Sequence, residues 1–327
     1  MTKNYAGIDL GSNSCKILIC DENKKVLYVD NVSTRLAEGM YENNIITEDA
    51  IERCQKCFYE YKRMLDKYDV APDNVRAITT AACRMAKNGN DVVKRIYDES
   101  HIKLDIIDSK EEAELNLKGA IEHVLGKSDY VVVYDLGGAS TEITLAKNSK
   151  NPEIISTVSI PWGARNSSEA FDLVEYDKER ADKLRDEVDK TLDVFFEKSG
   201  SLKDKDVTFV ATSSTPLRLV SMIKQFKSYD REKADGQIMN KNDMDKAIGY
   251  IFGAKRTELA KNPYIGDKRS YIFIAAAVIF KQIYDRLEIN EVTASLKSAK
   301  DGIVTDLMDK DKKVSILNAR KKNGKAY

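Results

Sequence analysis

Alternation of apolar and polar positions predicts short strands along this chain, and apolar positions three or four residues apart predict amphipathic helices. The first part predicts strands at 5–9, 16–20 and 26–33, a strongly amphipathic helix at 47–68, a strand at 75–80, a helix from about 89, a strand at 104–107 and a helix at 110–125. The order is strand, strand, strand, helix, strand, helix.

The same order starts again near residue 129. Strands are expected at 129–135, 141–146 and 153–160, followed by a helix at 177–198, a strand at 207–212, mostly helix over 215–287, a strand at 291–295 and a helix near 300–310. A chain of 327 residues is long enough for two domains with separate cores. The pattern therefore predicts a duplicated α/β fold.

The expected domains comprise residues 1–125 and 126–298, with the helix near 299–310 packing back on the first domain and a basic tail at 311–327, of which "NARKKNGKAY" (318–327) is expected to be frayed. In open α/β sheets, ligands bind beyond the carboxyl ends of the strands. Two domains of this kind are therefore expected to flank one cleft.

Two similar turns end the first strand of each half, Asp9-Leu10-Gly11-Ser12-Asn13-Ser14 and Asp135-Leu136-Gly137-Gly138-Ala139-Ser140. Glycine lets backbone N–H groups approach an anion, and hydroxyl residues add further donors. One such turn is typical of a β-hairpin, but its repetition at matching places favours a ligand site. The predicted phosphate-binding residues are Gly11, Ser12, Asn13, Ser14, Lys16, Gly137, Gly138, Ala139, Ser140 and Thr141.

The aspartates that lead these turns, Asp9 and Asp135, are placed to hold a hydrated Mg²⁺, with Mn²⁺ as an alternative, because Mg²⁺ prefers one or two carboxylates together with water and substrate oxygens. Glu142 is a third candidate ligand, although alternation in a strand also explains it. Lys16 either reaches the same phosphates or points outward from its strand. No P-loop motif and no dinucleotide-binding glycine motif after the first strand occurs in the chain.

Charge and composition exclude several classes of protein. Basic and acidic residues are equal at 53 each, which argues against a nucleic-acid partner held by a surface-wide basic field. The 2 histidines make a histidine-based catalytic or metal site unexpected, and the 5 cysteines form no disulfide framework. Cys54 and Cys57 are interpreted as small residues on a helix face. Without a secretory signal or a long apolar run, we expect a soluble cytoplasmic protein with no membrane partner.

Four stretches in sequence order, "IDLGSNSCKILI", "TTAACRMAKNG", "IIDSKEEAELNLKGA" and "VVVYDLGGASTEITL", resemble the exopolyphosphatase and guanosine pentaphosphate phosphohydrolase family. The resemblance covers nearly the whole chain and is to the short two-domain members. It implies two duplicated actin-like (ribonuclease H-like) α/β domains, the fold that actin, Hsp70 and sugar kinases share. It also implies a homodimer.

The resemblance also implies individual roles. Glu112 matches the family's general base, although Ser109 and Glu112 have the spacing of a helix capping box, and Glu111 is expected to be a solvated neighbour. Arg84 matches an arginine near the phosphates. This chain departs from the family pattern in its second domain and near its end, at Ala139, Ser213, Ser214 and Lys300, where three glycines and an arginine are usual.

We therefore expect a Mg²⁺-dependent exopolyphosphatase, a phosphoric anhydride hydrolase that releases the terminal phosphate of inorganic polyphosphate by water activated at Glu112. The alternative substrate is guanosine pentaphosphate (pppGpp). Two rivals stay open at this point. One is a kinase of the same fold group, which would form ADP and a phosphorylated acceptor, and the other is a sensor that binds polyphosphate or an alarmone without hydrolysing it.

Overall fold

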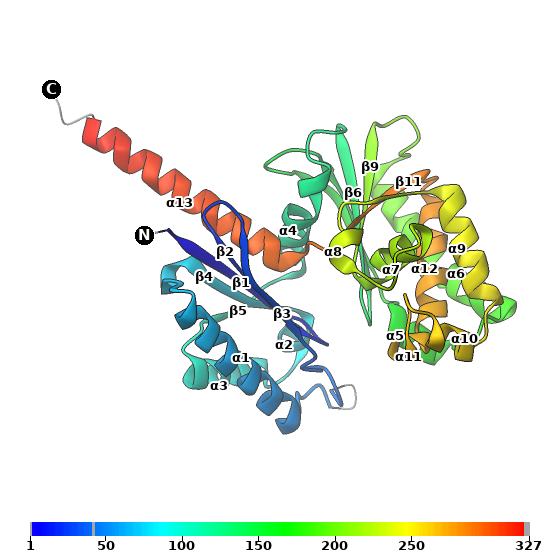
Figure 1. Cartoon of the computed structure of the whole chain (residues 1–327), viewed down its shortest axis with the longest axis horizontal. Helices are drawn as coiled ribbons and strands as arrows, with labels where there is room; N and C mark the ends of the chain where they lie inside the picture. The colour runs from blue at the N-terminus through cyan, green and yellow to red at the C-terminus, as the bar shows by residue number, and fades with distance from the viewer. Residues whose placement is uncertain (1, 41–42, 324–327) are drawn as a thin grey trace. The chain divides into compact units, whose positions relative to one another are not determined.

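The computed structural model describes residues 2–40 and 43–323 and divides the chain into two compact units (Figure 1). Unit 1 comprises Met1–Gly119 and Ala299–Tyr327, and unit 2 comprises Ala120–Ser298. The chain therefore passes into unit 2 after Gly119 and returns at Ala299. The cleft expected between the domains stays a prediction.

Unit 1 contains a five-stranded sheet in the order β3-β2-β1-β4-β5. β1, β2 and β3 are antiparallel neighbours, whereas β4 and β5 run parallel to β1. The strands are β1 (Asn4–Leu10), β2 (Cys15–Asp21), β3 (Val26–Val32), β4 (Val75–Thr79) and β5 (Leu104–Ile106). All five strands lie where the apolar alternation predicts them.

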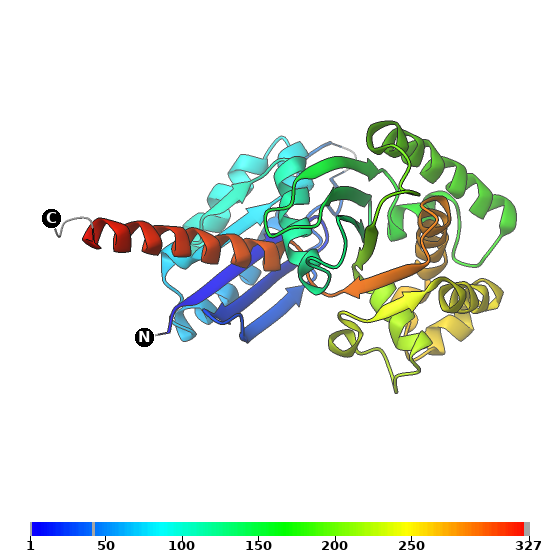
Figure 2. The same cartoon turned by 90° about the horizontal axis from the view of Figure 1, so that it is seen from above.

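Helices cover both faces of this sheet (Figures 1 and 2). Alternate residues of β1 point to opposite faces, so this strand contributes apolar side chains to the core on each side. Ile8 and Leu10 join the apolar cluster of α1, whereas Tyr5 joins a cluster with Val304 and Met308 of α13. The helices are α1 (Glu48–Lys67), α2 (Ala81–Met85), α3 (Gly89–Ser100), α4 (Ser109–Ala120) and α13 (Ala299–Asn323), with a 3₁₀ turn at Pro72–Asn74.

Helices α1 and α13 bear on two predictions from the sequence, the role of Cys54 and Cys57 and the end of the last helix. Cys54 and Cys57 lie on the buried face of α1 as free thiols, as small core residues do. The last helix is longer than the expected 300–310, because α13 continues without a break to Asn323 and so extends into the basic tail. The basic residues of this segment are good helix formers, so they extend the helix. Residues 324–327 lie outside the described part of the chain.

Unit 2 repeats the strand order of unit 1 and adds one strand at the edge. Its sheet has the order β10-β11-β9-β6-β7-β8, in which β6, β7 and β8 are antiparallel and β9 and β11 run parallel to β6. The strands are β6 (Tyr130–Leu136), β7 (Thr141–Lys147), β8 (Ile154–Ile160), β9 (Val207–Thr212), β10 (Ile238–Asn240) and β11 (Glu291–Ser295). The predicted duplication of an α/β plan is confirmed.

A large apolar core joins this sheet to its helices, with α12 at its centre, since Phe273 through Phe280 are all buried. The helices are α5 (Ala164–Ala170), α6 (Lys178–Ser199), α7 (Ser214–Ile223), α8 (Arg231–Ala234), α9 (Lys241–Gly253), α10 (Arg256–Lys261), α11 (Asp267–Ser270) and α12 (Phe273–Arg286), with a 3₁₀ turn at Ile121–His123. The short elements α2, α5 and β10 were missed, because a few residues carry too little periodicity. Among the described residues, no helix has the length and apolar character needed to cross a membrane.

Candidate phosphate-binding and catalytic site

The first predicted turn is a tight hairpin connection between β1 and β2. The N–H of Gly11 donates to the carbonyl of Ser14 over 3.0 Å. The carbonyls of Ser12 and Asn13 accept from the backbone N–H groups of Ala37 and Arg35, at 2.9 and 3.0 Å. Because a trans peptide directs its C=O and N–H to opposite sides, the N–H groups of Asn13 and Ser14 point away from residues 35–37.

The second turn repeats this geometry 126 residues further along the chain. The N–H of Gly137 donates to the carbonyl of Ser140 over 2.9 Å. Helix α5 replaces residues 35–37 as the backing: the carbonyls of Gly137 and Gly138 accept from the N–H groups of Ala164 and Arg165, at 2.9 and 2.8 Å. The N–H groups of Gly138 and Ala139 therefore point away from α5. Each turn thus directs consecutive amides to one side, an arrangement that suits phosphate oxygens.

Helix α5 approaches the second turn closely because its N-cap is Gly163. A Cβ on Gly163 would lie 2.6 Å from the backbone nitrogen of Ala139 and 2.7 Å from the carbonyl oxygen of Gly137. Asn166 completes the contact by donating from its side chain to the carbonyl of Ala139 over 2.8 Å. The turn is therefore held from behind by the stretch "PWGARN", residues 161–166.

The residue pairs beside the two turns carry different charges. Asp9 pairs across the hairpin with Lys16, and Asp135 occupies the equivalent position opposite Glu142. In unit 1 the Nζ of Lys16 lies 3.7 Å from Oδ2 of Asp9, so this lysine turns toward the aspartate beside its turn. In unit 2 two carboxylates are neighbours instead, and the pair has no such compensating lysine. The equivalent positions therefore form an ion pair in one unit and a repulsive pair in the other.

Burial and the neighbouring charge of Asp135 both affect the pKa of Glu142. Burial, followed by the nearby charge of Asp135, raises the pKa of Glu142 from 4.5 to about 7. Hydrogen bonds from Ser140 and Ser159 act in the opposite direction, and the hydroxyl of Ser159 lies 3.1 Å from Oε1 of Glu142. A bound cation would relieve this repulsion, so Asp135 and Glu142 fit a Mg²⁺ ligand pair better than Asp9 does.

The described residues contain no cluster of three or more histidine, cysteine, aspartate and glutamate side chains arranged for a metal ion. A Mg²⁺ ion at Asp135 and Glu142 would therefore depend on water and on substrate oxygens for its remaining ligands. Mg²⁺ binds in this manner at many phosphate sites, because it retains water and uses one or two carboxylates. The donor set of unit 2 is consistent with such a site.

Glu112 lies in the first turn of α4, the helix of unit 1 that follows β5. The capping box expected from Ser109 and Glu112 is absent from this helix, because the helix begins at Ser109 and Asp108 caps it. Oδ1 of Asp108 accepts from the N–H of Glu111 over 2.8 Å. Ser109 is therefore not the N-cap of α4, and the capping box that its spacing to Glu112 suggested is not formed.

Arg84 of α2 connects to the start of α4 through three groups. Its Nη1 donates to the carbonyl of Ile107 over 2.7 Å, and its Nη2 donates to the hydroxyl of Ser109 over 3.0 Å. Oε2 of Glu112 lies 3.9 Å from the same Nη1. The guanidinium therefore anchors the loop before α4 and adjoins the carboxylate that the sequence singled out. Arg84 and Glu112 are brought together by the fold of unit 1.

Glu111 remains partly exposed, as the sequence suggested, but it also forms an ion pair, with its side chain 42% exposed. Its Oε1 accepts a hydrogen bond from Nη2 of Arg76, which projects from β4. This pair directs Glu111 toward the sheet, and Glu112, the next residue, lies about 100° further around the helix. The two adjacent glutamates consequently face different surroundings.

Three departures from the family pattern have distinct consequences. Ala139 does not adopt a positive φ, so its methyl group is tolerated in the turn. Lys300 is buried, and its Nζ lies 2.6 Å from Oδ2 of Asp301. Ser214 begins α7 and is sterically unremarkable there.

Ser213 is the departure that strains the backbone. It stands at the end of β9, next to Thr212, which pairs with Asp135 in the sheet. Its φ of 87° and ψ of −179° lie in a region that is essentially restricted to glycine. Its hydroxyl is buried and has no hydrogen-bond partner among the described residues. Serine at this position therefore combines backbone strain with an unsatisfied polar group.

Two arginines that accompany the second turn were not predicted from the sequence. Arg165 contributes the backbone N–H that binds Gly138, and its side chain is exposed. Arg269 of α11 is partly buried, and its pKa is lowered by burial and by the nearby Arg165. Within residues 2–40 and 43–323, neither side chain has a carboxylate within ion-pair distance. Single arginines in unrelated stretches carry no sequence pattern, so only the fold reveals this positive region.

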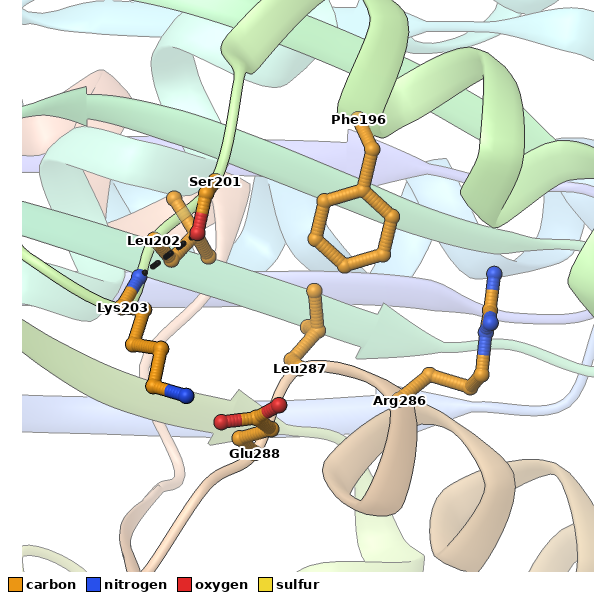
Figure 3. A pocket seen from close by; sticks show the side chains of 7 residues that line it. All are labelled: Phe196, Ser201, Leu202, Lys203, Arg286, Leu287 and Glu288. Carbon is orange, nitrogen blue, oxygen red and sulfur yellow. Dashed lines mark hydrogen bonds between the residues drawn. The ribbon is translucent and has the colours of Figure 1, made fainter.

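A pocket elsewhere in unit 2 contains none of the predicted site residues. It is lined by Phe196, Ser201, Leu202, Lys203, Arg286, Leu287 and Glu288 (Figure 3). The guanidinium of Arg286 forms ion pairs with Asp189 and Asp193 of α6. The pocket adjoins the ends of α6 and α12 and therefore lies apart from the strand-end turns.

The duplicated sheets, with a glycine turn after the first strand of each, define a protein of two actin-like domains. Among solved structures, the Ppx/GppA family member of Aquifex aeolicus matches 95% of this chain and 99% of its own, with a TM-score of 0.81 at 22% identity. An exopolyphosphatase from Cytophaga hutchinsonii matches 94% of this chain and 98% of its own, with a TM-score of 0.80 at 22% identity.

The model of the Ppx/GppA phosphatase family matches residues 19–311, and the chain belongs to this family. A curated relative, the bifunctional 3-dehydroquinate synthase/phosphatase of Fusobacterium nucleatum, is 30% identical over 294 residues. The match covers 86% of this chain but 43% of that protein, so this chain spans less than half of the relative's length.

Replacing Ser213 with glycine is expected to stabilise the protein. Glycine relieves a backbone strain of about 1–3 kcal/mol and removes the unsatisfied hydroxyl, against a cost of about 0.5–1 kcal/mol in chain entropy. Urea unfolding of Ser213→Gly should therefore show a gain of about 1 kcal/mol. Ser214→Gly, one residue further in a helical conformation, should instead lose stability, and an equal loss in both variants would contradict the strain.

Replacing Glu142 with glutamine is expected to stabilise the protein at high pH. Because its pKa is about 7 when folded and near 4.5 when unfolded, Glu142 contributes stability that is complete below pH 4.5 and lost as the pH rises through 7. Without metal, Glu142→Gln should gain up to about 3 kcal/mol over the unmodified protein at pH 8, and little at pH 4.5. A pH-independent difference in unfolding free energy would contradict this origin.

Proposed function

We propose that this protein hydrolyses the terminal phosphate of inorganic polyphosphate and releases orthophosphate. The observation that carries the proposal is the position of Glu112, at the start of α4 with its carboxylate 3.9 Å from the Arg84 guanidinium. A carboxylate in the first turn of a helix, beside an arginine that could bind phosphate oxygens, suits a general base. Membership of a phosphatase family supports this choice of reaction class.

In the proposed reaction, Glu112 accepts a proton from water as the water oxygen bonds to the terminal phosphorus. The bond between that phosphorus and the bridging oxygen breaks, and the bridging oxygen stays with the shortened polyphosphate. Arg84 would bind oxygens of the phosphate, for which a planar guanidinium is suited. Phosphoryl transfer requires little more from a protein than positioning and neutralisation of charge.

Each of the two turns offers hydrogen-bond donors to phosphate oxygens. The amides directed away from residues 35–37 and from α5 would each donate a hydrogen bond to a phosphate oxygen. Arg165 and Arg269 would add positive charge beside the second turn, where carboxylate partners for them are missing from the described residues. A substrate with many phosphates uses such distributed donors better than a phosphomonoester would.

Mg²⁺ is the cation that best fits Asp135 and Glu142, with Mn²⁺ as the alternative. When bound, it would neutralise negative charge on phosphate oxygens and supply part of the electrostatic stabilisation. The carboxylates would orient it from β6 and β7, two adjacent strands of one rigid sheet. Asp9, which the sequence suggested as a ligand, would instead act with Lys16 beside the first turn.

The second candidate substrate is pppGpp, whose terminal phosphate would be removed by the same groups. Membership of the Ppx/GppA phosphatase family is compatible with either substrate, and the described geometry suits phosphates and includes no site for a base. Comparison of phosphate release from short polyphosphate, long polyphosphate and pppGpp would rank the substrates. A kinase would yield ADP and a phosphorylated acceptor, whereas a sensor would bind without turnover.

Replacing Glu112 with glutamine is expected to lower the rate of phosphate release by about 10² to 10⁴, the usual loss for a positioned base. The substitution preserves size and removes the proton acceptor. Glu114→Gln is a matched control, because Glu114 lies on the same helix, 4.0 Å from Lys110, and has no proposed role. Equal turnover in the two variants would remove Glu112 from the mechanism.

Mg²⁺ is expected to stabilise unit 2 through Asp135 and Glu142, independently of any reaction. With substrate absent, 10 mM Mg²⁺ should raise the Tm of the unmodified protein by a few degrees relative to Na⁺ at equal ionic strength, as a ligand of the folded state does. Asp135→Asn should abolish this increase, whereas substitution of the exposed Asp204 by asparagine should preserve it. An unchanged increase in Asp135→Asn would place the metal elsewhere.

A further inference from the structure

A series of alternating charges holds one face of α4 in unit 1. Arg76 of β4 bonds Glu111 through Nη2, and its Nη1 lies 4.0 Å from Oδ2 of Asp306 on α13. Lys118 of α4 bonds the other oxygen of Asp306 through its Nζ. Asp306 therefore contacts both Arg76, which binds Glu111 at the start of α4, and Lys118 in the last turn of α4.

The middle of α4 is held by a close backbone contact. A Cβ on Gly302 of α13 would lie 1.9 Å from the carbonyl oxygen of Leu115, so the two helices approach as closely as a glycine permits. Leu115 also joins the apolar cluster of Ile78 from β4 and Ile303 from α13. Glu111, Leu115 and Lys118 are spaced i, i+4 and i+7, which places all three on one face.

This face determines the direction in which Glu112 points. Consecutive residues of a helix are rotated by about 100°, so Glu112 does not lie on the held face but keeps a fixed angle to it. A helix with side chains has a radius of about 5–6 Å, and rotation by roughly 10° would move the carboxylate by about 1 Å. A misplacement of that size can reduce a rate by about 10².

We propose that Asp306 is a positioning residue for Glu112. It neutralises both Arg76 and Lys118, and it links α13 to the two ends of α4. The charged side chains of the series are between 25% and 42% exposed, so each pair adds little to overall stability, and its main effect is on the orientation of the helix. The inference rests on the proposed role of Glu112.

The first experiment compares Asp306→Asn with Asp311→Asn in the full-length chain, with release of orthophosphate from long-chain polyphosphate as the readout. Asp311 is a close match, since it lies on the same helix, is 31% exposed against 30% for Asp306, and pairs with Lys3 and Tyr5 of the first strand region. We expect kcat to fall about 10-fold in Asp306→Asn with KM nearly unchanged. In Asp311→Asn, both kcat and KM should equal those of the unmodified protein. Equal effects on kcat in the two variants would overturn the proposal.

The second experiment asks whether Asp306 acts through Glu112. In a Glu112→Gln background, adding Asp306→Asn should produce no further loss of kcat, because there is no longer a base to position. A general structural defect would lower the rate again by the same factor, and this result would also overturn the proposal.

The proposed function and the positioning role fail in different ways. If Glu112→Gln turns over normally, the function assigned to Glu112 fails, and this inference fails with it. If Glu112→Gln is inactive and Asp306→Asn matches Asp311→Asn, only the inference fails. Should Asp306→Asn not fold, Lys118→Met tests the same link from α4: we expect a several-fold lower kcat at a preserved Tm, and an unchanged kcat would overturn the link.

Discussion

The geometry of the two strand-end turns depends on the backbone hydrogen bonds that hold their carbonyl groups from behind. Residues 35–37 bind the carbonyls of the first turn, and the start of α5 binds those of the second. Because C=O and N–H of one peptide oppose each other, this backing directs consecutive amides to the other side. A glycine turn without such backing would be a hairpin connection. With it, each turn presents consecutive amides on one side, an arrangement that suits an anion.

Duplication repeats the backbone but not the charges. Lys16 neutralises Asp9 in unit 1, whereas Glu142 stands in the equivalent place beside Asp135 in unit 2. In unit 1 the charge of Asp9 is neutralised by Lys16, whereas the two carboxylates of unit 2 form the pair at which we propose a bound cation. One ancestral plan can in this way provide a phosphate-binding turn in one unit and a candidate metal site in the other. The strain at Ser213 shows that unit 2 also departs from the plan at a cost in stability.

Unit 1 adds the groups proposed to act on water, and these depend on the C-terminal helix. Glu112 is carried by α4, Arg84 anchors the loop before it, and α13 holds another face of α4 through Gly302 and Asp306. Since α13 begins where the chain returns from unit 2, residues nearly 200 positions apart in sequence share one small assembly. Placement of the carboxylate is thus a property of three packed elements, not of the helix that carries it.

The sequence by itself determined the strands, the long helices, their duplication, and the equivalence of the turns at Asp9 and Asp135, because these follow from local periodicity and from repetition. It also singled out Glu112 and Arg84, through family resemblance. Only the tertiary structure decided that Asp108 caps α4, that Glu111 pairs with Arg76, that Arg165 and Arg269 accompany the second turn, and that α13 extends to Asn323. Cap choice and ion pairing depend on which side chains meet in space, and sequence spacing does not encode contacts between distant elements.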